Sequence, residues 1–207
     1  GNSGWVDTIW TFSLGLFGVG SALWPLAGAP PNARRWLVAA LVAIWSLRLG
    51  VHIAIRSAGI SDDPRYAAFA REWGADSPRR MFIFLQNQGL GSVPLAFAIF
   101  VAAHAPGAGL RLADYMGALI LLTGIAGEAL ADAQLKAFRT DPANTGRVCD
   151  VGLWRWSRHP NYFGETCVWW GYWLIASEHP WGWFTVFSPA LMTWSIRAAS
   201  STSLLVM

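Results

Sequence analysis

The chain has 207 residues, of which 54% are hydrophobic and only 13% are charged. Because a soluble domain carries roughly a quarter charged residues, this composition excludes an ordinary soluble protein. The net charge of +3 does not indicate a nucleic-acid-binding protein, since the basic residues lie in short loops between hydrophobic segments. The two cysteines, Cys149 and Cys167, and the four scattered histidines form neither a disulfide framework nor a metal-binding pattern.

Six hydrophobic stretches, each near the ~20 residues that cross a bilayer, predict transmembrane helices. Their continuous hydrophobicity favours helices over a β-barrel, whose strands alternate in hydrophobicity. We therefore expect an all-α integral membrane protein, a single bundle of about six helices that forms one domain over residues 1–207. The chain opens with GNSG and no initiator Met, which indicates a processed or incomplete chain. The expected spans are 5–26, 36–55, 82–104, 113–135, 162–178 and 181–198.

Basic residues are distributed unequally between the two sides of this predicted bundle. The less basic side holds only Arg34, Arg35 and Arg111. By the positive-inside rule, the other side is cytoplasmic and includes both termini, in what we expect to be a bacterial inner membrane. The cytoplasmic side then holds Arg56, Arg65, Arg71, Arg79, Arg80, Lys136, Arg139, Arg147, Arg155, Arg158 and Arg197.

Polar residues within the first two spans are candidates for function, because ionisable groups are costly in a membrane. Asp7 lies near the start of the first span, where it is either interfacial or, if buried, a proton donor. In the second span Arg48, His52 and Arg56 follow at i, i+4 and i+8 and so share one helix face. Arg56 can extend to the interface, but Arg48 lies about 12 Å deeper. His52 is either a structural histidine or a catalytic one.

A run of amides and glycines, QNQGLGSVP (86–94), interrupts the third span as a ligand-facing kink or an interfacial re-entry. In the fourth span Glu128, Asp132 and Lys136 again follow at i, i+4 and i+8, with Arg139 on the same face. On this face the acidic residues lie deeper in the membrane and the basic residues lie nearer the cytosol. This order suits a ligand with a hydrogen-bonding body and an anionic end. The alternative is that Asp132 and Lys136 form an ion pair with each other and bind no ligand.

The stretch WRWSRHPNYFGE (154–165) predicts an anion-binding helix start. Pro160 disfavours a helical residue before it, so a helix begins here, with Asn161 as the expected N-cap. The first turn of a helix offers free N–H groups and a positive dipole end, which bind phosphate or carboxylate groups. Glu165, one turn into the helix, suits a hydroxyl, amide or ring-nitrogen donor. The basic residues directly before the helix are Arg155, Arg158 and His159.

The motif RHPNYFGE, with the preceding GRVCDVGLW and EALADAQL, resembles the steroid 5-alpha-reductase family, in particular its bacterial membrane members of mostly unassigned substrate. The wider superfamily includes sterol C14-reductases and, more distantly, isoprenylcysteine carboxyl methyltransferases, which share an Arg-His-Pro-x-Tyr-x-Gly core. The resemblance covers most of the chain and is strongest over 124–177. It implies a multi-helix membrane fold that receives NADPH from the cytosolic side.

The resemblance also implies roles for residues of the fourth span and the loop after it. Asp132 and Arg139 match an aspartate and an arginine that contact the cofactor in the family. Glu128, one turn earlier, matches a cofactor-facing asparagine. Arg147 matches an arginine of the following loop.

Further matches lie in the fifth span and in the segment after the second. Asn161 and Glu165 match the family's asparagine and glutamate near the nicotinamide, whereas Arg56 resembles the arginine that closes the earlier polar stripe. Arg65 more weakly matches a phosphate-contacting arginine. The expected cofactor-binding residues are Arg56, Arg65, Glu128, Asp132, Lys136, Arg139, Arg147, Arg158, His159, Asn161, Tyr162 and Glu165.

One catalytic residue of the family has no counterpart here. Steroid-reducing members polarise the substrate ketone with a tyrosine in the earlier stripe, paired with a glutamate, and the aligned position here is Ile53. The remaining candidates for the acid are Asp7, His52 and Tyr66, in that order. We therefore expect an NADPH-dependent reductase of a lipophilic enone that enters from the bilayer, with hydride added to the β-carbon.

Two other functions remain open from the sequence. An S-adenosylmethionine-dependent membrane methyltransferase shares the RHP-x-Y-x-G core. A non-catalytic sterol- or lipid-binding protein of the same fold is favoured by the missing tyrosine and by the lack of the family's basic C-terminal segment.

Overall fold

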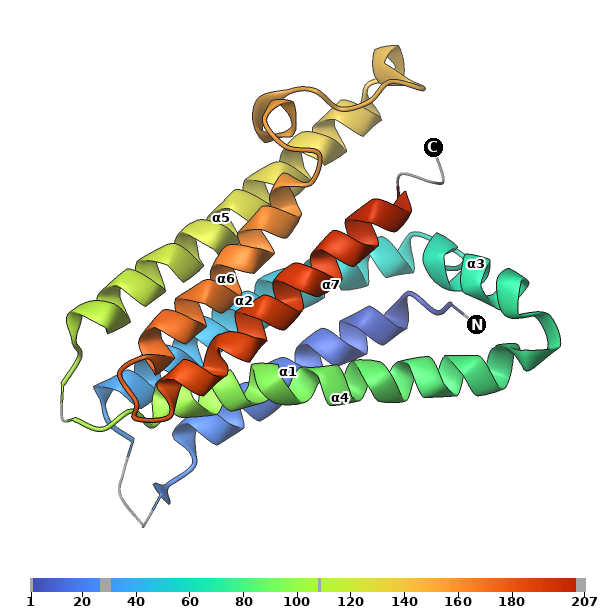
Figure 1. The fold of residues 1–207 in the computed structure, drawn as a ribbon. Helices are drawn as coiled ribbons and strands as arrows, with labels where there is room; N and C mark the ends of the chain where they lie inside the picture. The colour runs from blue at the N-terminus through green and yellow to red at the C-terminus, as the bar shows by residue number, and fades with distance from the viewer. Residues whose placement is uncertain (1, 27–30, 108, 204–207) are drawn as a thin grey trace. The chain divides into compact units, whose positions relative to one another are not determined.

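The computed structural model describes residues 2–26, 31–107 and 109–203, with side chains described as far as Arg197. Helices make up 81% of these described residues, and no strand occurs among them (Figure 1). Short 3₁₀ helices join the long ones: η2 (Gly74–Asp76), η3 (Pro142–Asn144), η4 (Gly152–Arg155) and η5 (Gly182–Val186). The α-helices are α1 (Trp5–Leu23), α2 (Ala33–Ala58), α3 (Pro64–Trp73), α4 (Ser77–Ala103), α5 (Leu112–Thr140), α6 (Pro160–Ala176) and α7 (Phe187–Ser203).

The long helices confirm the predicted class, an all-α integral membrane protein. Among the described residues, four helical stretches are long and apolar enough to cross a bilayer: α1, α2, α5 and the stretch Pro64–Ala103 that contains α4. The other two expected spans correspond to α6 and α7, each of 17 residues. At 1.5 Å per residue each is about 26 Å long, slightly less than the ~30 Å hydrocarbon core.

The structure adds one helix that was not expected and moves the start of the last one, both for local reasons. The ten-residue helix α3 was not expected, although Asp63 and Pro64 supply an N-cap and a first-turn proline. The last span was expected from residue 181, but η5 precedes α7 there. A Cβ on Gly182 would lie 2.0 Å from the Ala176 carbonyl oxygen, so the chain turns tightly before α7 begins.

Contacts divide the chain into two compact units, Gly1–His104 with α1 to α4 and Ala105–Met207 with α5 to α7. In the first unit α1 packs antiparallel to α2 through small residues. A Cβ on Gly15 would lie 2.0 Å from Ser46 Oγ, which donates to the Thr11 carbonyl at 3.1 Å. At the N-terminal end of α1, Ser57 Oγ of α2 donates to the Gly4 carbonyl at 3.0 Å. Small residues thus bring the two backbones close, as is usual between membrane helices.

Arg34 and Arg35, assigned by the sequence to the less basic loop, are buried. Arg35 Nε donates to the Ala22 carbonyl at 2.9 Å, and its guanidinium also donates to the Trp24 carbonyl. These carbonyls belong to the C-terminal end of α1, which has no intrahelical donors for them. Arg35, at the start of α2, therefore caps the C-terminal end of α1. Asn32, the N-cap of α2, accepts a hydrogen bond from the Arg35 amide at 3.0 Å.

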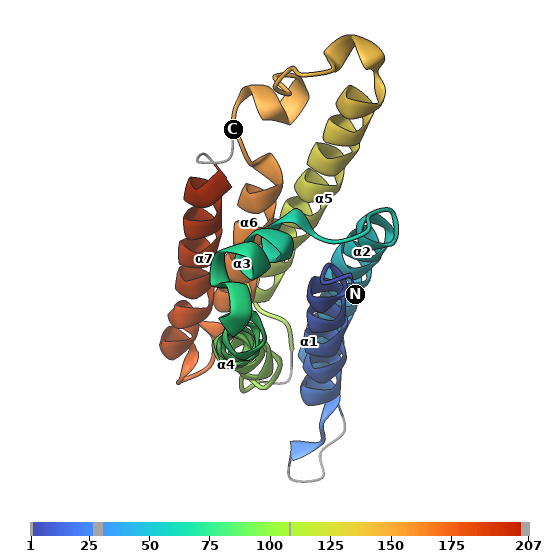
Figure 2. The same ribbon diagram turned by 90° about the vertical axis from the view of Figure 1, so that its right-hand side faces the viewer.

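In the second unit α6 lies between α5 and α7 (Figure 2). Reciprocal glycines bring α5 and α6 together in antiparallel register. A Cβ on Gly117 would lie 2.6 Å from the Gly171 carbonyl oxygen, and a Cβ on Gly171 would lie 2.7 Å from that of Gly117. Gly124 and Gly164 repeat this arrangement at 2.6 and 2.7 Å. Each pair is seven residues from the next on its own helix, so all four glycines lie on the facing sides.

Candidate functional site

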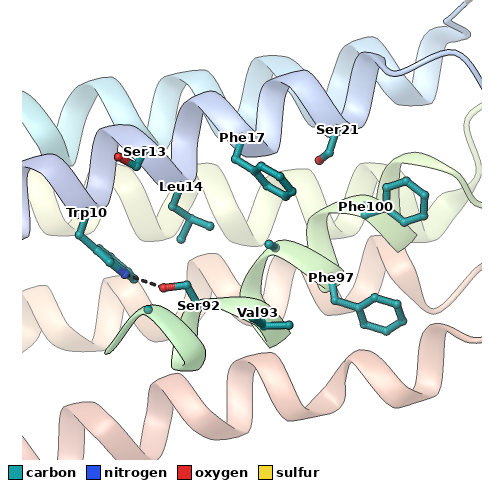
Figure 3. Close-up of a pocket in the computed structure, with 11 residues that line it drawn as sticks. Trp10, Ser13, Leu14, Phe17, Ser21, Ser92, Val93, Phe97 and Phe100 are labelled. Carbon is teal, nitrogen blue, oxygen red and sulfur yellow. Dashed lines mark hydrogen bonds between the residues drawn. The ribbon is translucent and has the colours of Figure 1, made fainter. Parts of the chain in front are cut away.

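An apolar groove of about 530 Å³ lies between α1 and α4 in the first unit (Figure 3). Its volume is within the range of small-molecule sites. Trp10 Nε1 donates to Ser92 Oγ at 2.7 Å on one side of it. The helix α4 is continuous through Pro94, so the amide- and glycine-rich run lines a groove and forms no re-entrant loop. The lining residues are Trp10, Ser13, Leu14, Phe17, Ser21, Gly89, Ser92, Val93, Ala96, Phe97 and Phe100.

A carboxylate lies one helical turn from the groove. Asp7, Trp10, Leu14 and Phe17 follow at intervals of three and four residues, so they share one face of α1. Asp7 is therefore about 5 Å along the helix axis from Trp10, toward the N-terminal end of α1. Asp7 thus lies just beyond the Trp10 end of a groove whose own lining is almost entirely apolar.

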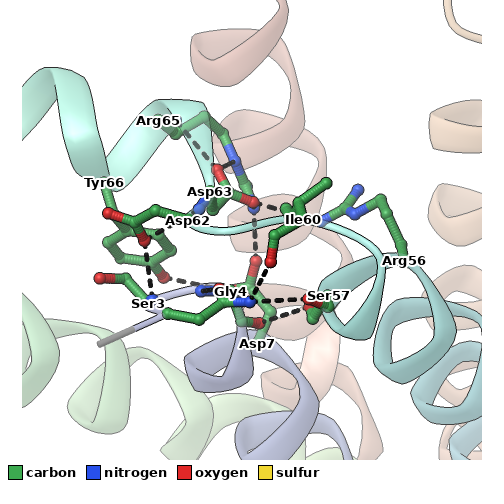
Figure 4. A network of polar contacts seen from close by, with 11 residues as sticks. Ser3, Gly4, Asp7, Arg56, Ser57, Ile60, Asp62, Asp63, Arg65 and Tyr66 are labelled. Atoms are coloured by element: carbon green, nitrogen blue, oxygen red, sulfur yellow. Dashed lines mark hydrogen bonds and ion pairs between the residues drawn. The ribbon is translucent and has the colours of Figure 1, made fainter.

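Asp7 is paired with two other predicted site residues (Figure 4). Its Oδ1 accepts a hydrogen bond from the Tyr66 hydroxyl at 3.0 Å, and its Oδ2 accepts one from Arg65 Nη2 at 2.6 Å. Asp63 also binds Arg65, and we call Asp7, Asp63, Arg65 and Tyr66 the Asp7 network. The network joins the start of α1 to the start of α3.

Asp63 fixes the position of the Arg65 guanidinium. As the N-cap of α3 its Oδ1 accepts from the Arg65 amide at 2.9 Å and from Arg65 Nε at 3.0 Å, while Oδ2 accepts from Nη2 at 2.9 Å. Arg56 Nη2 lies 3.5 Å from the same Oδ2. Burial raises the pKa of the Asp63 carboxyl, but these hydrogen bonds and positive charges outweigh it and hold the pKa below the ordinary 3.8.

The segment before α1 is tied to the loop between α2 and α3. Asn2 Nδ2 donates to the carbonyls of Ser57 and Ile60 at 2.7 and 2.8 Å. The Ser3 amide donates to Asp62 Oδ1 at 2.8 Å, and this bond is the main cause of the lowered pKa of Asp62. These bonds hold both sides of the Asp7 network in one place.

Replacing Asp63 with asparagine is expected to lower the free energy of unfolding at pH 7 by about 1–2 kcal/mol, because charged hydrogen bonds to Arg65 are lost. The folded-state pKa of Asp63 lies below its unfolded value, so its contribution is present above about pH 4 and is lost as pH falls further. The Asp63→Asn variant should therefore lose less stability than the wild type between pH 5 and 3, as followed by thermal unfolding in detergent.

The exposed Asp76, whose side chain makes no helix-capping bond, provides the control. Asp76→Asn should leave both the stability at pH 7 and its acid dependence unchanged. Equal behaviour of the two variants would contradict the assigned role of Asp63.

The Tyr66 ring is buried, with 4% of its surface exposed. Phe84 on α4 packs edge-on against it at 6.1 Å, and Phe69 on α3 does so at 6.4 Å. Trp73 stacks on Phe69 at 5.2 Å. The Tyr66 hydroxyl is thus the polar tip of an aromatic cluster, facing the Asp7 carboxylate.

In the second unit Asp132 on α5 and Asn161 on α6 face each other. Asn161 Nδ2 lies 3.3 Å from Asp132 Oδ1 and donates to it. The prediction that Asn161 caps α6 is wrong: the N-cap is His159, without a side-chain bond, and Asn161 lies in the first turn. Pro160 takes the first helical position, where its missing N–H costs nothing, and this places the cap two residues before the asparagine.

His159 stacks on Tyr162 with ring centroids 4.9 Å apart. Partial burial lowers the pKa of the His159 imidazole, and the nearby Arg158 charge lowers it further. The neutral imidazole is therefore favoured at neutral pH, so Arg158 is the residue of this pair that carries positive charge.

Two of the glutamates of the second unit, Glu128 and Glu165, are buried between helices. Glu128 is 3% exposed and lies over Gly164, whose Cβ would be 2.6 Å from Glu128 Cγ. Glu165 is 8% exposed, and its Oε1 accepts a hydrogen bond from Trp169 Nε1 at 2.8 Å. Trp169, one turn after Glu165, was not identified from the sequence, although their spacing of four residues predicts such a contact.

The structure places the predicted residues in two sets. The first unit brings together Asp7, Arg65 and Tyr66, with the exposed Arg56 nearby and His52 half-buried on α2. Binding of a single cofactor by both sets stays a prediction. The second unit holds the buried Glu128 and Glu165, the half-buried Asp132, His159, Asn161 and Tyr162, and the exposed Lys136, Arg139, Arg147 and Arg158.

Comparison with known proteins gives one match. The model of a family described as "Protein of unknown function (DUF1295)" matches residues 1–206. No curated protein and no solved structure matches the chain.

Proposed function

Because the chain belongs to the DUF1295 family, which is related to steroid 5-alpha-reductase-like membrane proteins, we propose that it is an NADPH-dependent reductase. Its substrate is a lipophilic enone, and the reaction saturates the conjugated carbon–carbon double bond. The observation that carries this proposal is the Tyr66–Asp7 hydrogen bond, one helical turn from an apolar groove. A tyrosine paired with a carboxylate is the acid that the family resemblance requires, supplied here from α3.

Tyr66 is the acid in this proposal, ahead of Asp7. The Asp7 carboxylate is ion-paired with Arg65 and accepts the Tyr66 hydrogen bond, so it acts as an acceptor. A carbonyl oxygen that comes to lie beside Asp7 can take over the Tyr66 hydrogen bond and become polarised by it. Tyr66 would then give its proton to the carbonyl oxygen, which leaves the Tyr66 phenolate and, with hydride on the β-carbon, the enol of the saturated product. Arg65 and Asp63 position Asp7 in this scheme.

The groove suits the apolar body of such a substrate. Phe17, Val93 and Phe97 are exposed at 62%, 60% and 44%, so the groove is open toward the surrounding lipid. On both helices its lining residues extend over about 16 Å. A hydrocarbon body of this length places its carbonyl near Asp7 and keeps water from the reacting atoms.

The donor set of the second unit fits a dinucleotide. NADPH supplies the hydride when it is bound. Arg139, Arg147 and Arg158 expose guanidinium groups, which match phosphate geometry, and the Asp132–Asn161 pair offers groups for a ribose or an amide. Arg65 fits a phosphate less well, because its Nε and Nη2 already donate to two carboxylates.

Binding of NADPH to the purified protein tests the proposal. We expect NADPH to raise the unfolding temperature and S-adenosylmethionine to leave it unchanged. Arg139→Ala should weaken NADPH binding about tenfold, as expected for the loss of a charged hydrogen bond to phosphate. Arg71→Ala, which removes an exposed arginine of α3, is the matched control. This variant should bind NADPH with wild-type affinity. Stabilisation by S-adenosylmethionine alone would instead favour a methyltransferase.

A further inference from the structure

The connection between α5 and α6 folds back along α5. Gln134 Oε1 accepts a hydrogen bond from the Leu153 amide at 2.9 Å, and Trp154 Nε1 donates to the Ala131 carbonyl at 2.8 Å. Gly152, with φ of 56°, has the Gln134 amide group 2.4–2.5 Å from the position of a Cβ. Only glycine fits this close approach and left-handed backbone, so η4 is held firmly against α5.

These bonds fix the position of η4 along α5. At 1.5 Å per residue, Ala131 and Gln134 lie about 28 and 33 Å along α5 from its first residue, Leu112. This distance equals the thickness of the hydrocarbon core, about 30 Å. With Leu112 at one border of the membrane, η4 therefore lies at the other border, although α5 itself continues to Thr140.

At this depth the chain exposes a tryptophan beside a cation. Trp154 is bound to α5, but Trp156, two residues later, has 88% of its surface exposed. Arg155 beside it is also exposed, as is Val151 just before η4. Tryptophan concentrates at membrane–water borders, where its ring sits among the headgroups, and arginine there is attracted to lipid phosphates.

We propose that Arg155 and Trp156 form an interfacial anchor that binds anionic lipid headgroups of the leaflet at this end of α5. The Trp156 indole lies among the headgroups and upper acyl carbons, and Arg155 contacts a lipid phosphate. Neither residue belongs to the cofactor set or to the Asp7 network. By the distribution of arginines, this leaflet is the cytoplasmic one, whose anionic lipids complement the charge of Arg155.

Site-specific fluorescence in nanodiscs tests this anchor. Cys149→Ser and Cys167→Ser remove the native thiols from the full chain. One environment-sensitive label is then attached to the cysteine of Trp156→Cys. A second variant carries the label at Ser157→Cys instead and keeps Trp156. We expect nitroxide lipids labelled near the top of the acyl chain to quench either label several-fold more than a label at Thr145→Cys. Thr145 is the matched control, because it is exposed on the same connection but lies beyond the end of α5.

The lipid preference is tested with the Ser157→Cys label. Quenching by nitroxide-labelled phosphatidylglycerol should exceed quenching by nitroxide-labelled phosphatidylcholine, and Arg155→Gln should reduce that excess about fivefold. Quenching of positions 156 and 157 by aqueous iodide and not by lipid would overturn the proposal. Protection from both quenchers would also overturn it, because another part of the protein would then cover the residues. Equal quenching by the two lipids would overturn the anionic preference.

Discussion

Replacing Tyr66 with phenylalanine is expected to lower enone-dependent NADPH oxidation by about 100-fold or more, because general acid catalysis contributes that much. The ring keeps its contacts with Phe69 and Phe84, and the Asp7–Arg65 ion pair remains. NADPH affinity should therefore be unchanged, and the loss should fall on kcat. Steady-state kinetics over a panel of hydrophobic enones, with direct NADPH binding, measures both quantities.

Tyr115→Phe is the matched control for this change. Tyr115 lies near the start of α5 with 60% of its surface exposed, and it belongs to neither set of site residues. It should keep full activity. A Tyr66→Phe variant with wild-type kcat on an enone that the wild type reduces would remove Tyr66 from the mechanism, and Asp7 and His52 would be tested next.

Gly124→Ala on α5 is expected to lower the free energy of unfolding by about 3 kcal/mol, the upper range for overpacking. The added Cβ would lie 2.6 Å from the Gly164 carbonyl oxygen and 3.0 Å from Cys167 Cβ. The nearest of these is a backbone atom, so relief requires α5 and α6 to move apart. Unfolding in mixed micelles gives the difference from the wild type.

The same substitution three residues further along α5 should act in the opposite direction. Gly127 has nothing within 4 Å of its Cβ position. Gly127→Ala should therefore stabilise the protein by up to about 1 kcal/mol, the difference in helix propensity between the two residues. If both changes had the same sign, the glycine contact between α5 and α6 would not be the source of the effect.

Four of the six expected spans were predictable because hydrophobic length alone defines a membrane helix, whereas local boundaries depend on finer signals. Residues 82–104 were expected to be helical, yet α4 begins at Ser77 because Pro78 favours a first helical turn there. The cap of α6 was placed at Asn161, since the asparagine was given more weight than the preference of Pro160 for the first helical position. Both errors lie at helix ends: α4 begins five residues before its expected start, and the cap of α6 lies two residues before Asn161.

The Asp7 network shows what a sequence alone does not contain. Asp7 and Tyr66 were each candidates for the acid, but they are 59 residues apart, and no spacing rule joins them. Their contact depends on the antiparallel packing of α1 and α2 and on the short helix α3, which was not predicted. Arg65 was expected to contact a phosphate, and the structure adds that Asp63, the carboxylate two residues earlier, binds its guanidinium.

The glycine contact between α5 and α6 has a consequence for biosynthesis. The helix α6 carries Glu165 and Asn161 and is only about 26 Å long. It therefore partitions poorly into lipid when it leaves the translocon alone. The helix α5 precedes α6 in the chain and packs against its glycine-lined side. We therefore expect the two helices to enter the bilayer together as a hairpin, and a mutation that widens their contact to reduce the yield of inserted protein as well as the stability of the mature fold.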